Sequence, residues 1–249
     1  IVDVLRVVDP QSKVWLKMML QPIEEDAVRE EFRKQLEGTT SDYLRKLGII
    51  RNCLYAIDIQ PIAVQITKLR FFISLLADQE VDTTLPNSGI LPFPNLETKI
   101  VCADSLKNIS ADLFVETAKK ELITARKQYY QPNITPTQRE TIADEIADIM
   151  DEVFPNFAEQ INLPRVCNKA VLKRWFIDAN LNAPFFDLET FFPEVTDGFD
   201  IVIGNPPYGG FKIAEEVRTA LDLGSNDPYG AFIARFLGNG TRITPLKDN

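Results

Sequence analysis

The residues with the clearest chemical potential lie in one short loop, Asn205-Pro206-Pro207-Tyr208. Residues 199–203, which precede the loop, are largely apolar and predict a buried strand of a parallel sheet. The two prolines have no backbone N–H and a fixed φ angle, so the loop after this strand is expected to be stiff. Asn205 and the Pro206 carbonyl can accept hydrogen bonds, and Tyr208 can stack on a flat ring. The loop predicts a site for a planar group that carries an amine, or else a turn that only ends the strand.

Two acidic residues end two further predicted strands, residues 53–58 and 99–104. Asp58 ends the first, and Asp104, followed by Ser105, ends the second. Open α/β sheets bind ligands at the carboxyl ends of their strands, where an acid typically accepts hydrogen bonds from ribose hydroxyls. Asp104 can likewise accept from an exocyclic amine. Each acid can equally cap the turn or helix that follows it, and spacing alone does not separate these two interpretations.

The composition excludes several kinds of chemistry. The 249 residues include no histidine, which removes Ser-His-Asp catalysis and imidazole bases, and the three cysteines, expected to be buried thiols, form no Cys-x-x-Cys metal pattern. The formal charge of −9 argues against DNA binding through the net field, so any such contact needs a local patch or a part of the protein outside this chain. No apolar run reaches the roughly 18 residues of a membrane span. We therefore expect a cytoplasmic protein with no membrane partner.

Hydrophobic periodicity predicts the elements that position the loop and the acids. A helix over residues 61–76 joins strands 53–58 and 99–104 into a βαβ unit with parallel strands. Its apolar stripe is expected to face the core and consists of Ile62, Ile66, Leu69, Ile73 and Leu76. Residues 111–165 predict an antiparallel helical hairpin inserted before strand 199–203. Other helices are predicted over residues 1–9, 22–36, 42–47, 169–180 and 229–236, with the aromatic residues Phe185, Phe186, Phe191 and Phe192 preceding the loop.

Several segments together resemble one known family. Residues 200–208 (DIVIGNPPY) look like the catalytic motif of the S-adenosylmethionine-dependent amino-methyltransferases. Residues 54–64 (LYAIDIQPIAV), 68–70 (KLR), 101–106 (VCADSL) and 192–195 (FPEV) are similar, in order, to adenine-specific DNA methyltransferases of the type IIG restriction–modification and related phage-defence kind. The match runs from residue 1 to about residue 240, and it implies a prokaryotic source.

The resemblance implies an α/β fold with a doubly wound, mostly parallel sheet of the class I methyltransferase type. The cofactor would be S-adenosylmethionine, with no metal. Asp58 would bind its ribose, Ile59 would pack on its adenine, and Asp104, with Ser105 beside it, would hold its amino group.

On the target side, the resemblance implies methylation of the N6 amine of an adenine in double-stranded DNA. Asn205 and the Pro206 carbonyl would hold that amine, Pro207 would stiffen the loop, and Tyr208 would stack on the base. The base must be flipped because its amine is otherwise paired inside the duplex. Positioning and electrostatics would carry the reaction without a covalent intermediate.

One family feature is missing from the sequence. The glycine-rich loop that follows the family's first strand should precede Asp58, but the first glycine is Gly38 and no Gly-x-Gly comes before Asp58. Residues 1–9 resemble the helix that follows that loop. We therefore expect a fragment of a longer protein whose incomplete sheet lacks its first strand, which leaves a gap between its second and fourth strands. Such a fragment is expected to be inactive, or nearly so, by itself.

We predict three parts: residues 1–110 as the cofactor side of the core, 111–185 as the helical insertion, and 186–249 as the part with the catalytic loop. Two alternatives remain open. One is an amino-methyltransferase with the same loop that acts on protein glutamine or on guanine in RNA. The other is a non-catalytic interaction module that uses the helical hairpin as a docking surface.

Overall fold

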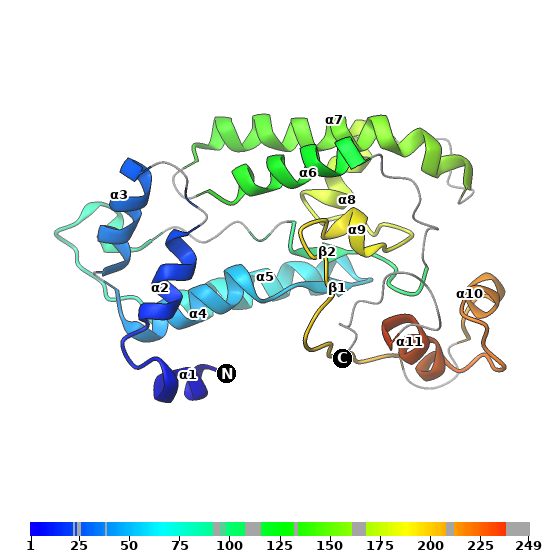
Figure 1. The fold of residues 1–249 in the computed structure, drawn as a ribbon, viewed down its shortest axis with the longest axis horizontal. Helices are drawn as coiled ribbons and strands as arrows, with labels where there is room; N and C mark the ends of the chain where they lie inside the picture. The colour runs from blue at the N-terminus through cyan, green and yellow to red at the C-terminus, as the bar shows by residue number, and fades with distance from the viewer. Residues whose placement is uncertain are drawn as a thin grey trace.

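The structure is a computed structural model that describes residues 1–21, 23, 26–37, 39–91, 96, 98–107, 116–131, 134–160, 168–207 and 212–237. Helices dominate this part of the chain (Figure 1). In order, the elements are α1 Val2–Val8, α2 Lys13–Leu20, α3 Asp26–Glu37, α4 Ser41–Asn52, β1 Ala56–Asp58, α5 Pro61–Leu76, the 3₁₀ turn Pro86–Gly89, β2 Ile100–Cys102, α6 Glu116–Tyr129, α7 Pro136–Gln160, α8 Lys169–Phe176, α9 Leu188–Phe191, α10 Glu215–Ala220 and α11 Pro228–Leu237.

The predicted βαβ unit is confirmed. β1 and β2 pair in parallel, with Ala56 opposite Ile100 and Asp58 opposite Cys102, and α5 connects the two strands. A parallel bridge between Ala103 and Ala183 extends pairing to the other edge of β2. The described residues form a two-stranded sheet, so the doubly wound sheet stays a prediction.

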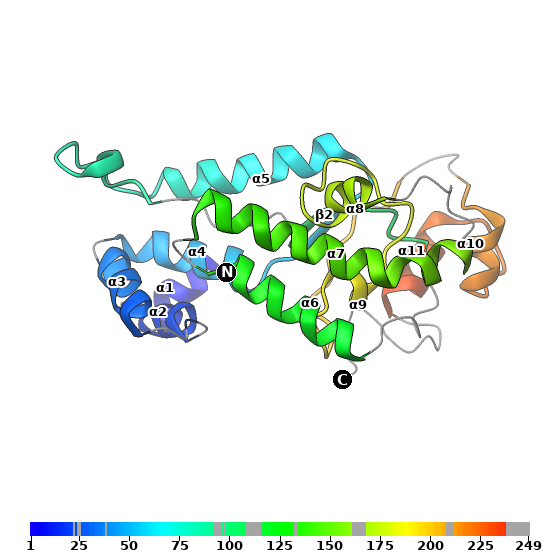
Figure 2. The ribbon, with the colours of Figure 1, turned by 90° about the horizontal axis from the view of Figure 1, so that it is seen from above.

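The small sheet lies between two hydrophobic cores, because successive side chains of a strand point to opposite faces. Val101 and Ala103 face one core, which is built with α6, α7, α8 and α9, whereas Ile100 and Cys102 face the other, built mainly with α2, α4 and α5. Figures 1 and 2 show these helices on the two sides of the strands. The strands are thus the shared wall of an α/β core with a helical layer on each face.

Helices α6 and α7 follow one another and pack together over much of their length (Figure 2). The predicted stripes lie at this contact: Leu122, Ala125 and Tyr129 of α6 are buried, as are Ile146, Ile149 and Val153 of α7. Their apolar spacing explains the packing, since residues three and four apart share a helix face. That this pair is an insertion into a methyltransferase core stays a prediction.

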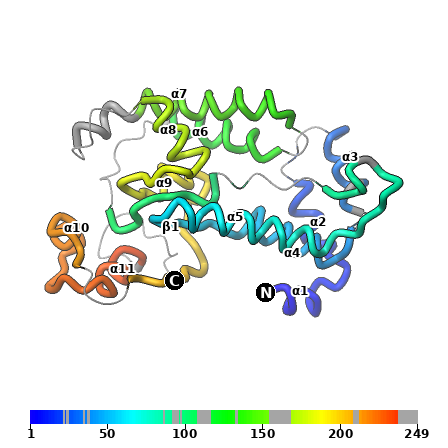
Figure 3. Tube along the Cα trace, turned by 180° about the vertical axis from the view of Figure 1, so that it is seen from behind, coloured from blue at the N-terminus to red at the C-terminus, as the bar shows by residue number. Residues whose placement is uncertain are grey.

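The prediction for the apolar stripe of α5 is wrong. Helix α5 forms where expected, but Ile62, Ile66, Leu69 and Ile73 are 50–65% exposed, and the buried residues of the helix are Val64 and Leu75. Figure 3 shows α5 on the outside of the molecule. The helix is apolar on both sides, so periodicity alone chose the wrong face.

The predicted strand over residues 199–203 is also wrong. Residues 201–207 have no regular secondary structure, and the side chains of Ile201 and Ile203 are 72% and 90% exposed. The segment runs down from the sheet, away from the layer of α6 and α7 (Figure 1). An apolar run becomes a strand only where a neighbouring strand supplies hydrogen-bond partners along its length. In the described residues a β-bridge is formed at Phe199, but the pairing does not continue along residues 201–203.

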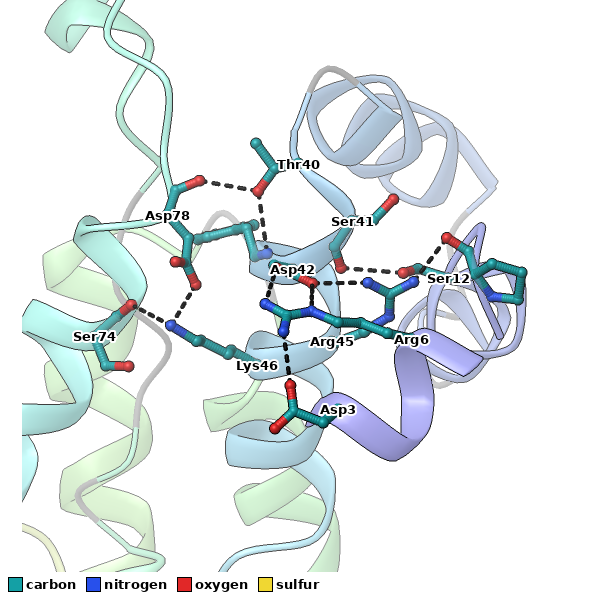
Figure 4. A network of polar contacts seen from close by, with 12 residues as sticks. Asp3, Arg6, Ser12, Thr40, Ser41, Asp42, Arg45, Lys46, Ser74 and Asp78 are labelled. Atoms are coloured by element: carbon teal, nitrogen blue, oxygen red, sulfur yellow. Dashed lines mark hydrogen bonds and ion pairs between the residues drawn. The ribbon is translucent and has the colours of Figure 1, made fainter. Parts of the chain in front are cut away.

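A polar network joins α1, α2 and α4 (Figure 4). Asp42 of α4 accepts hydrogen bonds from Arg6 of α1 and from the buried Arg45, which also donates to the carbonyl of Asp9 before α2. Hydrogen bonding to Arg6 is the main cause that lowers the pKa of Asp42 to about 2, despite opposition from burial. The network fixes the amino-terminal helices to one another.

Close backbone approach brings α2 onto α4. A Cβ atom on Gly48 would lie 2.6 Å from the ring of Trp15, a distance that ordinary side chains do not tolerate. Glycine at this position lets the indole of α2 lie directly on the backbone of α4.

Two expectations from composition can be compared with the structure. No described helix is long and apolar enough to cross a membrane. Cys102 is buried as expected, but Cys53 is exposed because it lies just past the end of α4, and Cys167 lies outside the described residues.

Candidate active site

The two strand-end acids lie at the same edge of the sheet. Asp58 is the last residue of β1, and Asp104 follows β2 by two residues. The carbonyl of Asp58 accepts a hydrogen bond from the Ala103 amide at 3.0 Å, and the Asp104 amide donates to the Ala183 carbonyl at 2.9 Å. These hydrogen bonds hold the backbones of the two acids next to each other, at the carboxyl ends of two neighbouring parallel strands.

Each acid also caps the turn after its strand. Asp58 Oδ1 accepts from the Gln60 amide at 2.8 Å, and Asp104 Oδ1 accepts from the Leu106 amide at 3.2 Å. Asp104 Oδ2 lies 4.0 Å from Lys107 Nζ, while Asp58 Oδ2 has no hydrogen-bond or ion-pair partner among the described residues. Capping orients the carboxylates and leaves one oxygen of each for another donor, so the two interpretations offered by the sequence are compatible.

Ile59 and Ser105 differ in surroundings. The side chain of Ile59 is 53% exposed beside Asp58, so an apolar surface adjoins this acid. Ser105 is partly buried, and its carbonyl accepts a hydrogen bond from Arg235 of α11, whose guanidinium also donates to the Phe186 carbonyl. Arg235 is 3% exposed and thus fixes α11 against the turn that carries Asp104.

The described residues of the loop, Asn205, Pro206 and Pro207, lie at the surface of the chain. Asn205 and Pro207 are exposed and Pro206 is half-buried, and a Cβ placed on Gly204 would meet nothing within 4 Å. No hydrogen bond among the described residues joins Asn205 to Asp58 or Asp104. Tyr208 lies outside the described residues, so its predicted stacking role is untested.

Tyr55, immediately before the strand that ends at Asp58, packs against residues 192–199, which lead to the Asn205 loop. The ring of Tyr55, three residues before Asp58, lies 4.8 Å from the ring of Phe192 and 5.3 Å from that of Phe199. Its hydroxyl donates to Glu194 Oε1 at 3.2 Å. Phe199 immediately precedes the motif of residues 200–208, so Tyr55 anchors the start of the loop segment to β1.

Below Tyr55, a buried ion pair ties the helical layer to the same segment. Arg126 of α6 donates two hydrogen bonds to Glu194, at 3.0 Å and 2.9 Å, and one to the Thr98 carbonyl. Burial opposes the charge on Glu194, but the charge and hydrogen bonds of Arg126 lower its pKa. Burial likewise opposes the charge on Arg126, while Tyr130 and Glu194 raise its pKa overall. The guanidinium and the carboxylate stabilise each other's charge at a site where Arg126 is buried and Glu194 is half-buried.

Lys99 completes this buried network. Its ammonium donates to the Arg51 carbonyl at 2.7 Å and to the Tyr55 hydroxyl at 3.2 Å, and it lies 4.3 Å from the centre of the Tyr55 ring. Burial lowers the pKa of Lys99 to about 8, against the opposing charge of Glu194. The lysine is 6% exposed, so its role is to position Tyr55 rather than to meet a ligand.

Sequence reasoning missed this positioning network of Tyr55, Lys99, Arg126 and Glu194 as a unit. Tyr55 and Glu194 lie inside segments that carried the resemblance, but neither received a role. The available signal was Arg126 in the apolar stripe of its helix, one residue after Ala125. A charged residue on a buried face needs a buried partner, which would have directed attention to an isolated acid such as Glu194.

A parallel pair of strands covered by helices on both faces defines an α/β protein, and the two acids lie at the edge of its sheet where ligands bind in open α/β folds. The chain belongs to the family described as Eco57I restriction-modification methylase, whose model matches residues 52–239. The matched part contains both acids and the Asn205 loop.

A relative from Methanocaldococcus jannaschii is 26% identical over 261 aligned residues, and its name describes a candidate type II restriction enzyme and methyltransferase. The alignment covers 77% of this chain and 21% of that protein, so the chain spans about a fifth of the length of this relative. No solved structure matches the chain significantly.

Proposed function

We propose that this chain is the catalytic part of an enzyme that transfers a methyl group from S-adenosylmethionine to the N6 amine of adenine in double-stranded DNA, within a restriction–modification or phage-defence system. Family membership supports DNA methyl transfer. The observation that carries the finer proposal is the pair of acids at the carboxyl ends of β1 and β2, with the Asn-Pro-Pro loop reached through Tyr55 and Phe199.

The acid edge has the hydrogen-bond acceptors and the apolar surface that S-adenosylmethionine requires. Asp58 keeps Oδ2 for a ribose hydroxyl, and Asp104 presents a carboxylate to an exocyclic amine, with Ser105 next to it. The exposed face of Ile59 offers apolar cover for an adenine ring. When bound, S-adenosylmethionine supplies an electrophilic methyl group on a positively charged sulfur.

On the target side, the Asn205 side-chain oxygen and the Pro206 carbonyl would each accept a hydrogen bond from the adenine amine. Two acceptors in fixed positions draw the amine lone pair out of conjugation with the ring and orient it for bond formation. The prolines contribute stiffness, since a fixed φ angle lowers the entropy lost when the loop closes on a base. Tyr208 would stack on the flipped base.

The test uses the full-length gene product, S-adenosylmethionine with a labelled methyl group, and duplex DNA, RNA and protein as separate acceptors. We expect label in DNA, recovered as N6-methyladenine after digestion to nucleosides. Label in protein or RNA alone, or in DNA on cytosine, would contradict the proposal.

A matched pair of variants then tests the loop. Asn205→Ala should lower methylation by at least about 100-fold, because removal of one preorganised hydrogen-bonding group typically costs that much. Asn205 is proposed to hold the target amine and forms no hydrogen bond with Asp58 or Asp104 among the described residues, so binding of S-adenosylmethionine, measured by calorimetry, should be unchanged. Asp58→Ala should show the reverse, with weaker cofactor binding. Full activity in Asn205→Ala would remove the loop from the site.

A further inference from the structure

A basic groove lies between α2 and α3, at the opposite end of the molecule from α10 and α11 (Figures 1 and 2). Its volume is about 550 Å³. The floor is apolar, from Leu16 and Leu20, and the walls carry basic residues from both helices. The lining residues are Lys13, Leu16, Lys17, Leu20, Gln21, Arg29 and Arg33.

The cations are arranged by helical spacing. Lys13 and Lys17 are four residues apart on α2, and Arg29 and Arg33 are four apart on α3, so each pair occupies one helix face. Neighbouring acids on α3 partly neutralise the arginines: Arg29 Nη1 lies 2.5 Å from Asp26 Oδ1, and Arg33 lies 3.7 Å from Glu30. The positive charge left over in the groove therefore comes mainly from α2.

Both lysines of α2 retain their charge for a ligand. Among the described residues, neither the Lys13 nor the Lys17 ammonium group forms an ion pair or a side-chain hydrogen bond. Both side chains are exposed. The chain has a formal charge of −9, so its net field repels polyanions such as DNA. The two lysines without ion-pair partners, beside two arginines, make the groove a place where that repulsion is locally offset.

The wall of the groove is held in place from below. Asp9 Oδ1 and Oδ2 accept from the amides of Lys13 and Val14, each at 3.0 Å, which caps the start of α2. Ser12 donates to the Ser41 carbonyl, and Trp15 lies on Gly48 of α4. Helix α2 is therefore fixed to the core, and its lysines project from a rigid support.

We propose that this groove binds backbone phosphates of duplex DNA. It would be the local positive patch that DNA binding requires in a chain whose net charge is negative. The inference rests on the proposed function, because the substrate class comes from it. Lys13 and Lys17 contact phosphates, while the paired arginines raise the local potential. The contacts carry no sequence information, since phosphates are the same at every base pair.

Repeated phosphates fit this groove better than a single anion does. Cations in two rows, on two helices, spread their charge along the groove instead of converging on one point. A lone phosphate would be favoured by buried, converging donors, whereas both lysines here are exposed. The shallow apolar floor can accept the aliphatic stems of the lysines and leaves their ammonium groups at the rim.

The experiment measures binding of a fluorescent duplex to the full-length gene product by anisotropy over a series of salt concentrations. Loss of two phosphate contacts should reduce the slope of log affinity against log salt by about 2. We expect that reduction in the double variant Lys13→Gln/Lys17→Gln, with weaker binding to cognate and unrelated duplexes by the same factor.

The control is Lys127→Gln/Lys169→Gln, which removes the same charge from α6, where Lys127 is exposed, and from α8, where Lys169 is half-buried and pairs with Asp148. Its salt slope should equal that of the wild type. Equal slopes in all three proteins, or no binding of duplex by the wild type, would overturn the inference. Acetylation of Lys13 and Lys17 in the wild type provides a second test. Protection of these lysines by inorganic phosphate or by vesicles of anionic lipid, but not by duplex DNA, would also overturn the inference.

Failure of the groove and failure of the proposed function are distinguishable. If both the wild type and Lys13→Gln/Lys17→Gln methylate adenine with the same KM for DNA, the proposed phosphate contacts of the groove are refuted and the proposed reaction stands. A protein whose salt slope falls in that variant, but which transfers no methyl group to DNA, supports the groove and refutes the proposed reaction.

Discussion

At the scale of single residues, the ion pair between Arg126 and Glu194 is the contact whose loss should matter most. Both charges are largely buried, with side-chain exposures of 4% and 21%. Either Arg126→Met or Glu194→Gln should lower the free energy of unfolding by about 3–5 kcal/mol, because each leaves the other charge buried without its partner.

The double variant Arg126→Met/Glu194→Gln should be less destabilised than the sum of the two single variants. Urea unfolding of all four proteins, arranged as a double-mutant cycle, measures the coupling. Additive losses would show that the two side chains act independently and contradict a coupled ion pair.

Lys99 gives the buried network a dependence on pH. Its pKa in the folded chain is about 8, below the ordinary lysine value of 10.5, so the unfolded chain binds more protons between these values. The free energy of unfolding should therefore rise as pH increases from about 8 towards about 9.5, where tyrosines of the unfolded chain are still protonated.

In Lys99→Met this rise should be absent, since the titrating group is gone. Denaturant unfolding of wild type and variant at a series of pH values provides the comparison. Burial raises the pKa of Cys102 to about 11 and also raises that of Cys53, so these thiols oppose the rise in both proteins. The test is therefore the difference between the two curves, and a difference that does not change with pH over this interval would exclude Lys99 as a source of pH dependence.

The individual residues show where sequence reasoning worked at this scale. Asp58 and Asp104 were placed correctly at strand ends, because the end of a short apolar run is a local signal. The contact between Arg126 and Glu194 spans 68 residues of sequence, and no local pattern specifies such a partner. Its recognition required the packing of α6 against the segment before the loop.

At the scale of elements, α5 presents an unusual surface. Its outer stripe of Ile62, Ile66, Leu69 and Ile73 is exposed, although residues with this spacing are typical of a buried face. Exposed side chains contribute little to folding, so Ile66→Gln should change the free energy of unfolding of residues 1–249 by no more than about 0.5 kcal/mol.

The matched variant on the buried face is Leu75→Ala, which should cost about 2–5 kcal/mol because Leu75 is 2% exposed. Thermal unfolding of both variants distinguishes the faces. Comparable losses in the two would mean that the stripe of Ile66 is covered in solution.

The helices and strands also show how much secondary structure hydrophobic periodicity can predict. Helices were predicted where α1, α3, α4, α5, α6, α7, α8 and α11 form, and strands where β1 and β2 pair. No element was predicted for α2, α9 or α10, and a strand was predicted wrongly at residues 199–203. Whether an apolar run is a strand depends on a neighbour in space, which the run itself does not encode.

At the scale of the whole molecule, the α/β class was predictable and the extent of the sheet was not. A strand, a helix and a strand in sequence imply parallel pairing, which the register of β1 and β2 confirms. The described structure supplies two cores on the two faces of that pair. The acid edge could be inferred from topology, whereas the Asn205 loop lies in an exposed segment whose approach to the acids remains a prediction.

The arrangement of two cores has a spectroscopic consequence. The chain has two tryptophans, Trp15 and Trp175, and each belongs to a different helical layer. Trp15 lies on Gly48 in the amino-terminal layer, and Trp175 lies 6.0 Å from the ring of Phe185 in the other core. Replacement of either one by phenylalanine leaves a single fluorophore that reports on one layer. If the two single-tryptophan variants show the same unfolding transition, the two helical layers unfold together across the strands β1 and β2. If their transitions differ, the two layers unfold as independent units.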